Sequence, residues 1–381
     1  MAHVVRDSLS PTLAPLLGYD ALLLYAHTLQ ATQNLSSELF LLAEAVVPCV
    51  QQPDYSPLVC RIWEELCLLA PVDTLQRFGS EMYAELASLL ADKDSPVIVA
   101  PVSAVECHLR ALAADARREA LHYFVELLHS TNVFAMLVTM LVRDEESAVI
   151  ATRFVCVLSR LAYTLPAPVF HQMVRASAPA VAQTLPEKPA VQHALQQHQS
   201  GGLWLVLVPG MIRRVENMAS MRKMKIAALG IASILRGATD ALDLPILGLV
   251  PDMVGAWTDV LGQVVEDAQG RSMLYEREES PDQPFGPEDL DDELDLGLLG
   301  SGFGALEDTS PTAKRSERLM EQDPVVTEPL RPYISASLNQ ALADHPQNTE
   351  GGAVLHQALA SIDPLVLDVL HKDLLQPPAS K

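Results

Sequence analysis

The stretch from Gly202 to Gly237 constrains the fold of this chain more than any other. Its second part, from Met224 to Leu235, is apolar almost all round, and a helix without a polar face must be buried on several sides. Small residues such as Gly230 allow neighbouring helices to approach closely. The first part has one apolar face, because apolar side chains recur there every four residues, at Leu203, Leu207, Met211 and Val215. The pattern predicts a helical hairpin whose second helix lies inside a helical stack.

Composition favours an all-α protein. Of the 381 residues, 49% are hydrophobic but only 5% are aromatic, and a chain rich in Leu, Ala and Val suits helix-on-helix packing. The 26 basic and 48 acidic residues give a net charge of −22. This charge disfavours binding to a nucleic-acid backbone, so we expect no nucleic-acid partner and consider a basic protein partner a better fit.

Further hairpins recur along the chain after roughly forty residues, which is the period of HEAT and armadillo arrays. The sequence therefore predicts an all-α, HEAT/armadillo-like helical-repeat solenoid with an acidic disordered loop. Because no letter-by-letter repeat is visible, an irregular helical bundle is the alternative. Pro and Gln/His residues between Pro166 and Gly202 indicate a connector with short helices. We expect four regions: a loose lead-in at 1–18, the helical array at 19–268, an acidic and glycine-rich flexible loop at 269–322, and helices completing the array at 323–376.

The acidic loop contains ten acids and one base between Glu276 and Asp295. Such a block, interrupted by prolines, cannot bury a core and is expected to be mobile. It either attracts a basic partner or acts as a solvated spacer that keeps the array soluble. The candidate partner-binding acids are Asp289, Asp291, Asp292, Glu293 and Asp295.

A basic joint connects the two helices of the hairpin described first. It concentrates positive charge in a strongly acidic chain, at Arg213, Arg214, Arg222, Lys223 and Lys225. The joint either contacts an acidic partner surface or neutralises helix C-terminal carbonyls and nearby acids; the second reading is favoured.

Motifs for catalysis, cofactors and metals are missing from the sequence. It contains no P-loop, HExxH or GxSxG motif, and the glycines near Gly302 lack the strand and spacing of a dinucleotide fingerprint. His193 and His198 have no Cys or acidic partner at a metal-binding spacing. We therefore expect no enzyme activity, no cofactor and no metal.

The five cysteines and the apolar segments indicate an intracellular protein. The cysteines form no CxxC pair, and Cys60 and Cys67 are expected to be core thiols. The N-terminus does not read as a secretory signal, and the most apolar windows are too short or too interrupted to cross a bilayer. We expect no membrane insertion.

Two segments resemble the exportin-2, or CAS-type, karyopherins of the importin-β superfamily. They are VFAMLVTMLVRDEESAVIATRFVCVLSRLA at Val133 to Ala162 and VLVPGMIRRVENMASMRKMKIAALGIASIL at Val206 to Leu235. Trp257, the acidic loop, Gly302-Phe303 and Asp323-Pro324-Val325 follow in the order of that family.

The resemblance implies a HEAT-repeat nuclear transport receptor that binds importin-α as cargo together with Ran-GTP. Such a receptor shuttles between nucleus and cytoplasm, carries importin-α outward and associates with nuclear pores, which also implies a location at the nuclear envelope. The alternative is a standalone helical scaffold with another protein client. Since the N-terminal arch of the family has no counterpart here, the chain is expected to be either a C-terminal fragment or a shortened form.

Overall fold

The computed structural model describes residues 2–10, 13–91, 98–115, 118–264, 311–364 and 366. The residues so described form α-helices, three short 3-10 helices and connecting turns, without a β-strand. This confirms the predicted all-α helical-repeat fold. The chain divides into two compact units, and helix α9 (Val133–Arg143) crosses the boundary after Met136.

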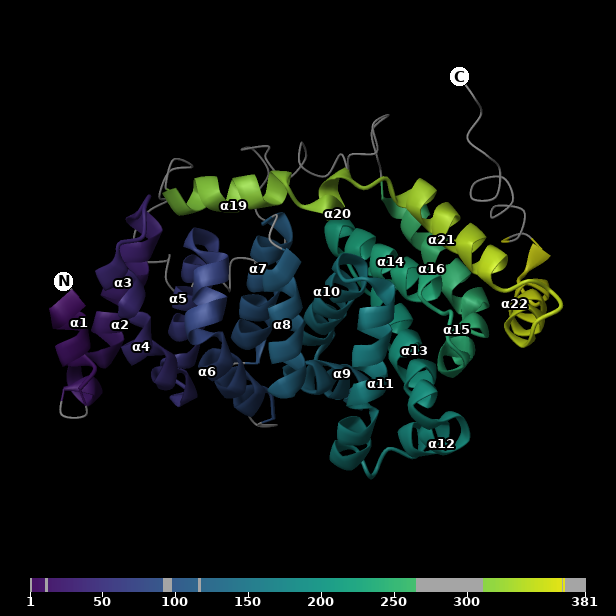
Figure 1. The fold of residues 1–381 in the computed structure, drawn as a ribbon, viewed down its shortest axis with the longest axis horizontal. Coiled ribbons are helices and arrows are strands. Elements are labelled where there is room, and N and C mark those ends of the chain that lie inside the picture. The colour runs from purple at the N-terminus through teal and green to yellow at the C-terminus, as the bar shows by residue number, and fades with distance from the viewer. Residues whose placement is uncertain are drawn as a thin grey trace, which may run out of the picture. The chain divides into compact units, whose positions relative to one another are not determined.

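Unit 1 comprises residues 1–136 and 289–323. Helix α5 lies at its centre and packs against α2, α6 and α7, while α6 also packs against α8 (Figure 1). The helices of this unit are α1 (Ala2–Ser8), α2 (Ala14–Ala31), α3 (Ser37–Leu41), α4 (Ala43–Val46), η1 (Val47–Gln51), α5 (Ser56–Leu69), α6 (Pro71–Ala91), α7 (Val99–Ala114), α8 (Arg118–Ser130) and α19 (Pro311–Glu321).

Unit 2 comprises residues 137–288 and 324–381. Its central helix is α14, which packs against α10, α11, α13, α16, α20 and α21. The helices of this unit, after α9, are α10 (Ala148–Thr164), α11 (Ala167–Thr184), α12 (Pro189–His198), η2 (Gln199–Leu203), α13 (Trp204–Val215), α14 (Met221–Arg236), η3 (Ala241–Asp243), α15 (Leu244–Leu247), α16 (Val250–Gln263), α20 (Pro324–Thr327), α21 (Leu330–Asp344) and α22 (Glu350–Ala360).

The predicted hairpin is present as α13 and α14. All four apolar side chains of the first helix are buried, and every residue from Met224 to Leu235 is buried in the second. A Cβ atom added at Gly230 would collide with the backbone of Ser159 on α10, so this glycine permits the close approach of the two helices. The indole of Trp257 donates a hydrogen bond to the carbonyl of Ala228 at 3.3 Å. The apolar sequence of α14 is thus explained by neighbours on several sides.

Parts of two segments expected to be loose are helical. Residues 1–18 contain α1 and the beginning of α2, because Val5 is fully buried and Pro15 lies in the first turn of α2, where its missing N–H costs nothing. Within the segment 269–322, which was predicted to be a flexible loop, residues 311–321 form the helix α19. The acids from Asp289 to Asp295 lie outside the described residues.

The predicted connector between Pro166 and Gly202 is more ordered than its composition indicated. Helix α11 is 18 residues long despite the internal Pro179, and it buries seven side chains. The polar stretch that follows α12 bends sharply at Gln199, which has a φ of 53°. Added Cβ atoms at Gly201 and Gly202 would collide with the carbonyl oxygens of Leu242 and Ala194. The segment is therefore a closely packed bend.

Residues 37–51 form three short helices. The Ser36 hydroxyl accepts a hydrogen bond from the Leu39 amide and caps α3, which α4 and η1 follow. In the described part of the chain, no single helix is long and apolar enough to cross a membrane. Two bent helix pairs, 119–143 and 241–263, meet that length and composition only in combination.

Candidate functional site

The basic joint lies where α13 ends and α14 begins. Arg213 and Arg214 occupy the last turn of α13, and both approach the carboxylate of Asp144, which follows α9. The Arg213 Nη2 atom is 3.6 Å from Asp144 Oδ2, and Arg214 donates a hydrogen bond to Oδ1 of the same residue. The side chain of Arg213 is 64% exposed, whereas that of Arg214 is 17% exposed. Arg213 is therefore the better placed of the two to meet another molecule.

The remaining predicted bases of the joint are less accessible. Lys225 is only 1% exposed, so a partner cannot reach it while α14 is in place. Arg222 and Lys223 are half-buried, and all three residues have interaction partners within the protein. The structure thus brings the predicted bases to one joint but does not present them as one surface. The predicted acidic residues Asp289, Asp291, Asp292, Glu293 and Asp295 lie outside the described residues, so the pairing of both sets with partners stays a prediction.

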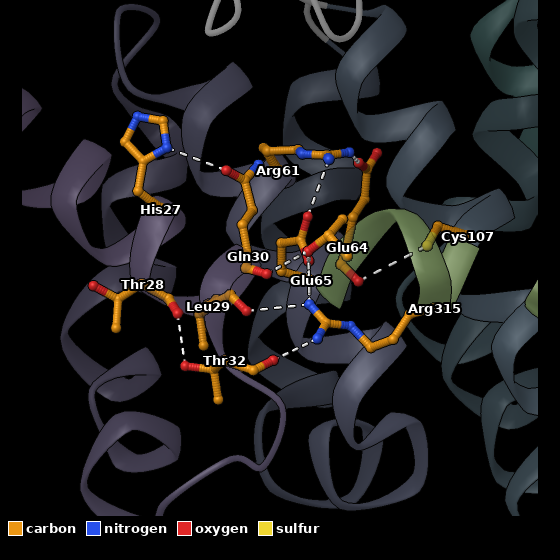
Figure 2. Close-up of polar contacts among 11 residues, drawn as sticks. His27, Thr28, Leu29, Gln30, Thr32, Arg61, Glu64, Glu65, Cys107 and Arg315 are labelled. Carbon is orange, nitrogen blue, oxygen red and sulfur yellow. Dashed lines mark hydrogen bonds and ion pairs between the residues drawn. The ribbon is translucent and has the colours of Figure 1, made fainter. Parts of the chain in front are cut away.

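A second charged cluster, which the sequence reading missed, surrounds Glu65 in unit 1. Figure 2 shows its members, which come from α2, α5 and α19. The Glu65 side chain is fully buried. Its Oε1 atom lies 3.0 Å from Arg61 Nη2, one helical turn earlier on α5, and its Oε2 atom lies 3.1 Å from Arg315 Nη2 on α19. A buried carboxylate needs such partners, because an unpaired charge in the interior is costly.

Helix α2 contributes its C-terminal carbonyl groups to this cluster. Arg315 donates hydrogen bonds from Nη1 to the Thr32 carbonyl at 2.5 Å and from Nη2 to the Leu29 carbonyl at 3.1 Å. The carbonyl groups at a helix C-terminus have no partner within the helix and carry the negative end of its dipole. Two kinds of negative group, helix-end carbonyls and a buried carboxylate, therefore converge on one guanidinium group.

Thr312 adds a hydroxyl to the same cluster. Its Oγ1 atom is 2.9 Å from Glu65 Oε2 and 3.0 Å from the carbonyl oxygen of Gln30. Burial alone would lower the pKa of Arg61, but the carboxylates of Glu64 and Glu65 outweigh it and raise that pKa above its usual value. Arg61 is therefore a charged partner of Glu65 in addition to Arg315. We call these residues the Glu65 cluster (Gln30, Leu29, Thr32, Arg61, Glu65, Thr312 and Arg315). Its carbonyl and carboxylate oxygens together bind the guanidinium group of Arg315.

Unit 2 contains a buried histidine–aspartate pair that could be mistaken for a catalytic dyad. His171 Nδ1 lies 2.9 Å from Asp243 Oδ2, and both side chains are 1% exposed. The geometry of this contact is not that of a hydrogen bond. The second ring nitrogen, Nε2, is 3.0 Å from the Ile234 carbonyl, which leaves no ring nitrogen to exchange a proton with a substrate. Trp204 Nε1 donates to Asp243 Oδ1 at 3.0 Å, so this pair fixes η3 against α11 and α13.

His108 and the cysteines are held in environments that suppress their reactivity. His108 Nε2 is 3.0 Å from the Pro71 carbonyl and Nδ1 is 2.9 Å from the Tyr83 hydroxyl. Burial lowers the pKa of His108 to about 4, so the ring is neutral at physiological pH. Cys60 and Cys67 are buried as predicted, and burial raises the pKa of both thiols. In the residues with described positions, no group of three His, Cys, Asp or Glu side chains has the arrangement of a metal site.

Comparison with known proteins gives the family. Residues 1–375 match the sequence profile described as importin-11-like, TPR repeats. This chain belongs to the importin-11-like family. The first helices of three consecutive pairs of this importin-11-like chain begin at Val99, Val133 and Ala167, 34 residues apart, which is the TPR period. A search among curated proteins found no match.

One solved structure has a similar fold. It is the structure of Lph2, described as a novel bidirectional nuclear transport receptor in S. cerevisiae, with a TM-score of 0.72 and 17% sequence identity. The match covers 99% of the importin-11-like chain and 36% of Lph2, so this chain spans about a third of that receptor. The expected karyopherin type is supported by these matches, which do not single out exportin-2.

Proposed function

We propose that this importin-11-like chain acts as part of a nuclear transport receptor and binds other proteins without catalysing a reaction. The observation that carries the proposal is the family match over residues 1–375. The fold likeness to a receptor is consistent with it. The buried His171 and His108, whose ring nitrogens face groups of the protein itself, offer no group for catalysis.

A transport assay tests the general form of this function. The fluorescently labelled chain is added to permeabilised cells, and its entry into nuclei is compared with that of an inert protein of equal mass. A receptor segment that contacts nuclear pores is expected to enter several times faster than the inert protein. Equal rates would contradict the pore association predicted for this chain.

The resemblance to exportin-2 suggests a sharper version, in which the cargo is importin-α and binding depends on Ran-GTP. Immobilised chain is incubated with importin-α in the presence of Ran loaded with GTP or GDP. Retention of importin-α that increases with the GTP form supports this version. If neither protein is retained, also when the chain is fused to the N-terminal arch of an export receptor, importin-α is not its cargo.

The alternative is a helical scaffold for a client outside nuclear transport. Crosslinking of the tagged chain in cells, followed by mass spectrometry, separates the two possibilities. A dominant client that never enters the nucleus would favour the scaffold. Recovery of Ran, nucleoporins or a shuttling cargo would favour the receptor.

The charged segments named from the sequence provide the contact residues of the proposed receptor. Arg213, with its exposed guanidinium, is the first candidate in the basic joint. In the acidic segment we propose Asp289, Asp291, Asp292, Glu293 and Asp295. Exchanging these five acids for Asn or Gln is expected to slow partner association at low salt and to leave the melting temperature unchanged. A lower melting temperature would show that they stabilise the fold.

A further inference from the structure

We propose that the Glu65 cluster is a binding site for the guanidinium group of a partner protein, and that Arg315 occupies it as an internal ligand. The partner segment would be a helix with a Ser or Thr residue three positions before an Arg, as Thr312 and Arg315 are placed on α19. This proposal concerns unit 1 alone and does not depend on a role in nuclear transport.

The chemistry of the acceptors matches a guanidinium group. The carbonyls of Leu29 and Thr32 and the carboxylate of Glu65 receive donors from the two terminal nitrogens of one side chain. A guanidinium group is planar and has donors pointing in several fixed directions, whereas a lysine ammonium group is a compact point charge. The site should therefore distinguish arginine from lysine.

The hydroxyl of Thr312 defines the second part of the recognised pattern. Residues three apart lie on the same side of a helix, so Thr312 and Arg315 face the cluster together. Arg315 Nη2 is also 2.7 Å from Thr312 Oγ1, which aligns the two side chains before they meet Glu65. A helix with this pair can reproduce every contact that α19 makes with Glu65.

Helix α19 is held in a way that permits exchange. None of its residues is buried, and Thr312 and Arg315 form hydrogen bonds to α2 and α5. Figure 1 shows α19 lying across the ends of α5 and α7. Arg61 lies 3.0 Å from Glu65 Oε1, so the buried carboxylate has a counter-charge besides Arg315. Segments held by few buried apolar contacts open most readily.

The experiment uses the full chain with Arg315→Ala, in which the site is emptied. The probe is a fluorescent peptide with the sequence of residues 311–321, PTAKRSERLME, and its binding is followed by anisotropy. We expect it to bind the Arg315→Ala chain at least tenfold more tightly than the unchanged chain, where the internal helix competes. The matched control is Arg318→Ala, which removes an exposed arginine of the same helix. The chain with this substitution should bind the peptide as weakly as the unchanged chain does.

Further variants test the chemistry and the partner. A peptide with lysine in place of Arg315 is expected to bind the Arg315→Ala chain at least tenfold more weakly than the original peptide does. The original peptide should also bind at least tenfold more weakly when the chain carries Glu65→Gln in addition to Arg315→Ala. Circular dichroism establishes that each chain is folded. A second probe, an alanine-rich helical peptide with only Thr-x-x-Arg in common with α19, represents the partner.

The results distinguish an internal ligand that can be exchanged from a fixed structural contact. If a folded Arg315→Ala chain does not bind the α19 peptide, or binds it no better than the unchanged chain, the internal-ligand assignment is wrong. If it binds the α19 peptide but not the alanine-rich peptide, the site is specific for α19 and the partner proposal fails. Equal binding of the arginine and lysine peptides would overturn the guanidinium assignment.

Discussion

Helix α14 buries twelve consecutive residues, from Met224 to Leu235, whereas α19 buries none. The first is surrounded by apolar neighbours, and Gly230 permits the close approach of Ser159 on α10. The second is held by Thr312 and Arg315, which meet one buried carboxylate and the end of α2. The difference indicates that α14 belongs to the structural core, while α19 has a detachable contact suited to regulation or exchange.

The same substitution in both helices should have very different effects. Leu229→Ala removes a fully buried side chain from α14 and is expected to cost about 2 to 5 kcal/mol in the free energy of unfolding of unit 2. Leu319→Ala in α19, where the leucine is half-buried, should cost no more than about 1 kcal/mol. Native-state hydrogen exchange of α14 and α19 measures both. Equal costs would remove the distinction between the two helices.

Acid should weaken the interior of unit 1 through His108. Its pKa is about 4 in the folded chain and roughly 6.5 in the unfolded chain, so the unfolded chain binds the proton more tightly. The contribution of neutral His108 to the free energy of unfolding is therefore fully present above pH 6.5. It decreases as the pH falls to 4, by about 3 kcal/mol in total. Urea unfolding across this range measures the loss. His108→Gln should remove this part of the pH dependence, whereas His122→Gln, at a 73% exposed side chain, should leave it intact.

A single hydroxyl should matter at the α19 contact. Thr312→Val keeps the shape of the side chain but removes the hydrogen bond to Glu65 or Gln30, at a cost of about 0.5 to 1.5 kcal/mol. Hydrogen exchange of the backbone amides of α19 should become faster, with little change in the amides of α5. Ser316→Ala on the same helix is the control. If α5 amides accelerate equally, α19 is part of the core of unit 1.

The smallest effect is expected at the basic joint. Arg213→Ala breaks a 3.6 Å contact to Asp144 from an exposed side chain, and such pairs contribute about 0 to 1 kcal/mol. Its melting temperature should stay close to that of the unchanged chain, while capture of an acidic partner weakens. Arg214→Ala, at a less exposed position, should lower the melting temperature more. The reverse order would mean that Arg213 is the structural residue of the pair.

The contrast also explains what could be predicted from sequence. Helices such as α13 and α14 could be predicted from residues close together in the sequence, because apolar side chains four residues apart lie on one face of a helix, and that face is buried. The contact between Glu65 and Arg315 joins residues 250 positions apart, and no local pattern encodes such a pair. An ion pair between Arg61 and Glu65 could be predicted, because the two residues are four apart on one helix. Its burial was not, since that depends on α2 and α19.

The charged joint was only partly predictable for the same reason. Its five bases are close in sequence, and periodicity placed Arg213 and Arg214 off the buried face of α13. It could not show that Lys225 would be enclosed, because a polar residue in an apolar run is normally expected at the surface. Likewise, the polar residues before Gly202 resembled a linker, since composition does not reveal that both glycines touch backbone carbonyls.

That bend has a practical consequence for dividing or tagging the chain. A boundary chosen by composition would fall at Gly201-Gly202, where a protease site or an affinity tag would have to displace the carbonyls of Leu242 and Ala194. Expression of the two halves from such a cut would divide η2, which packs against α11, α12 and α13. Truncations meant to map a binding partner should therefore keep α11 through α14 together.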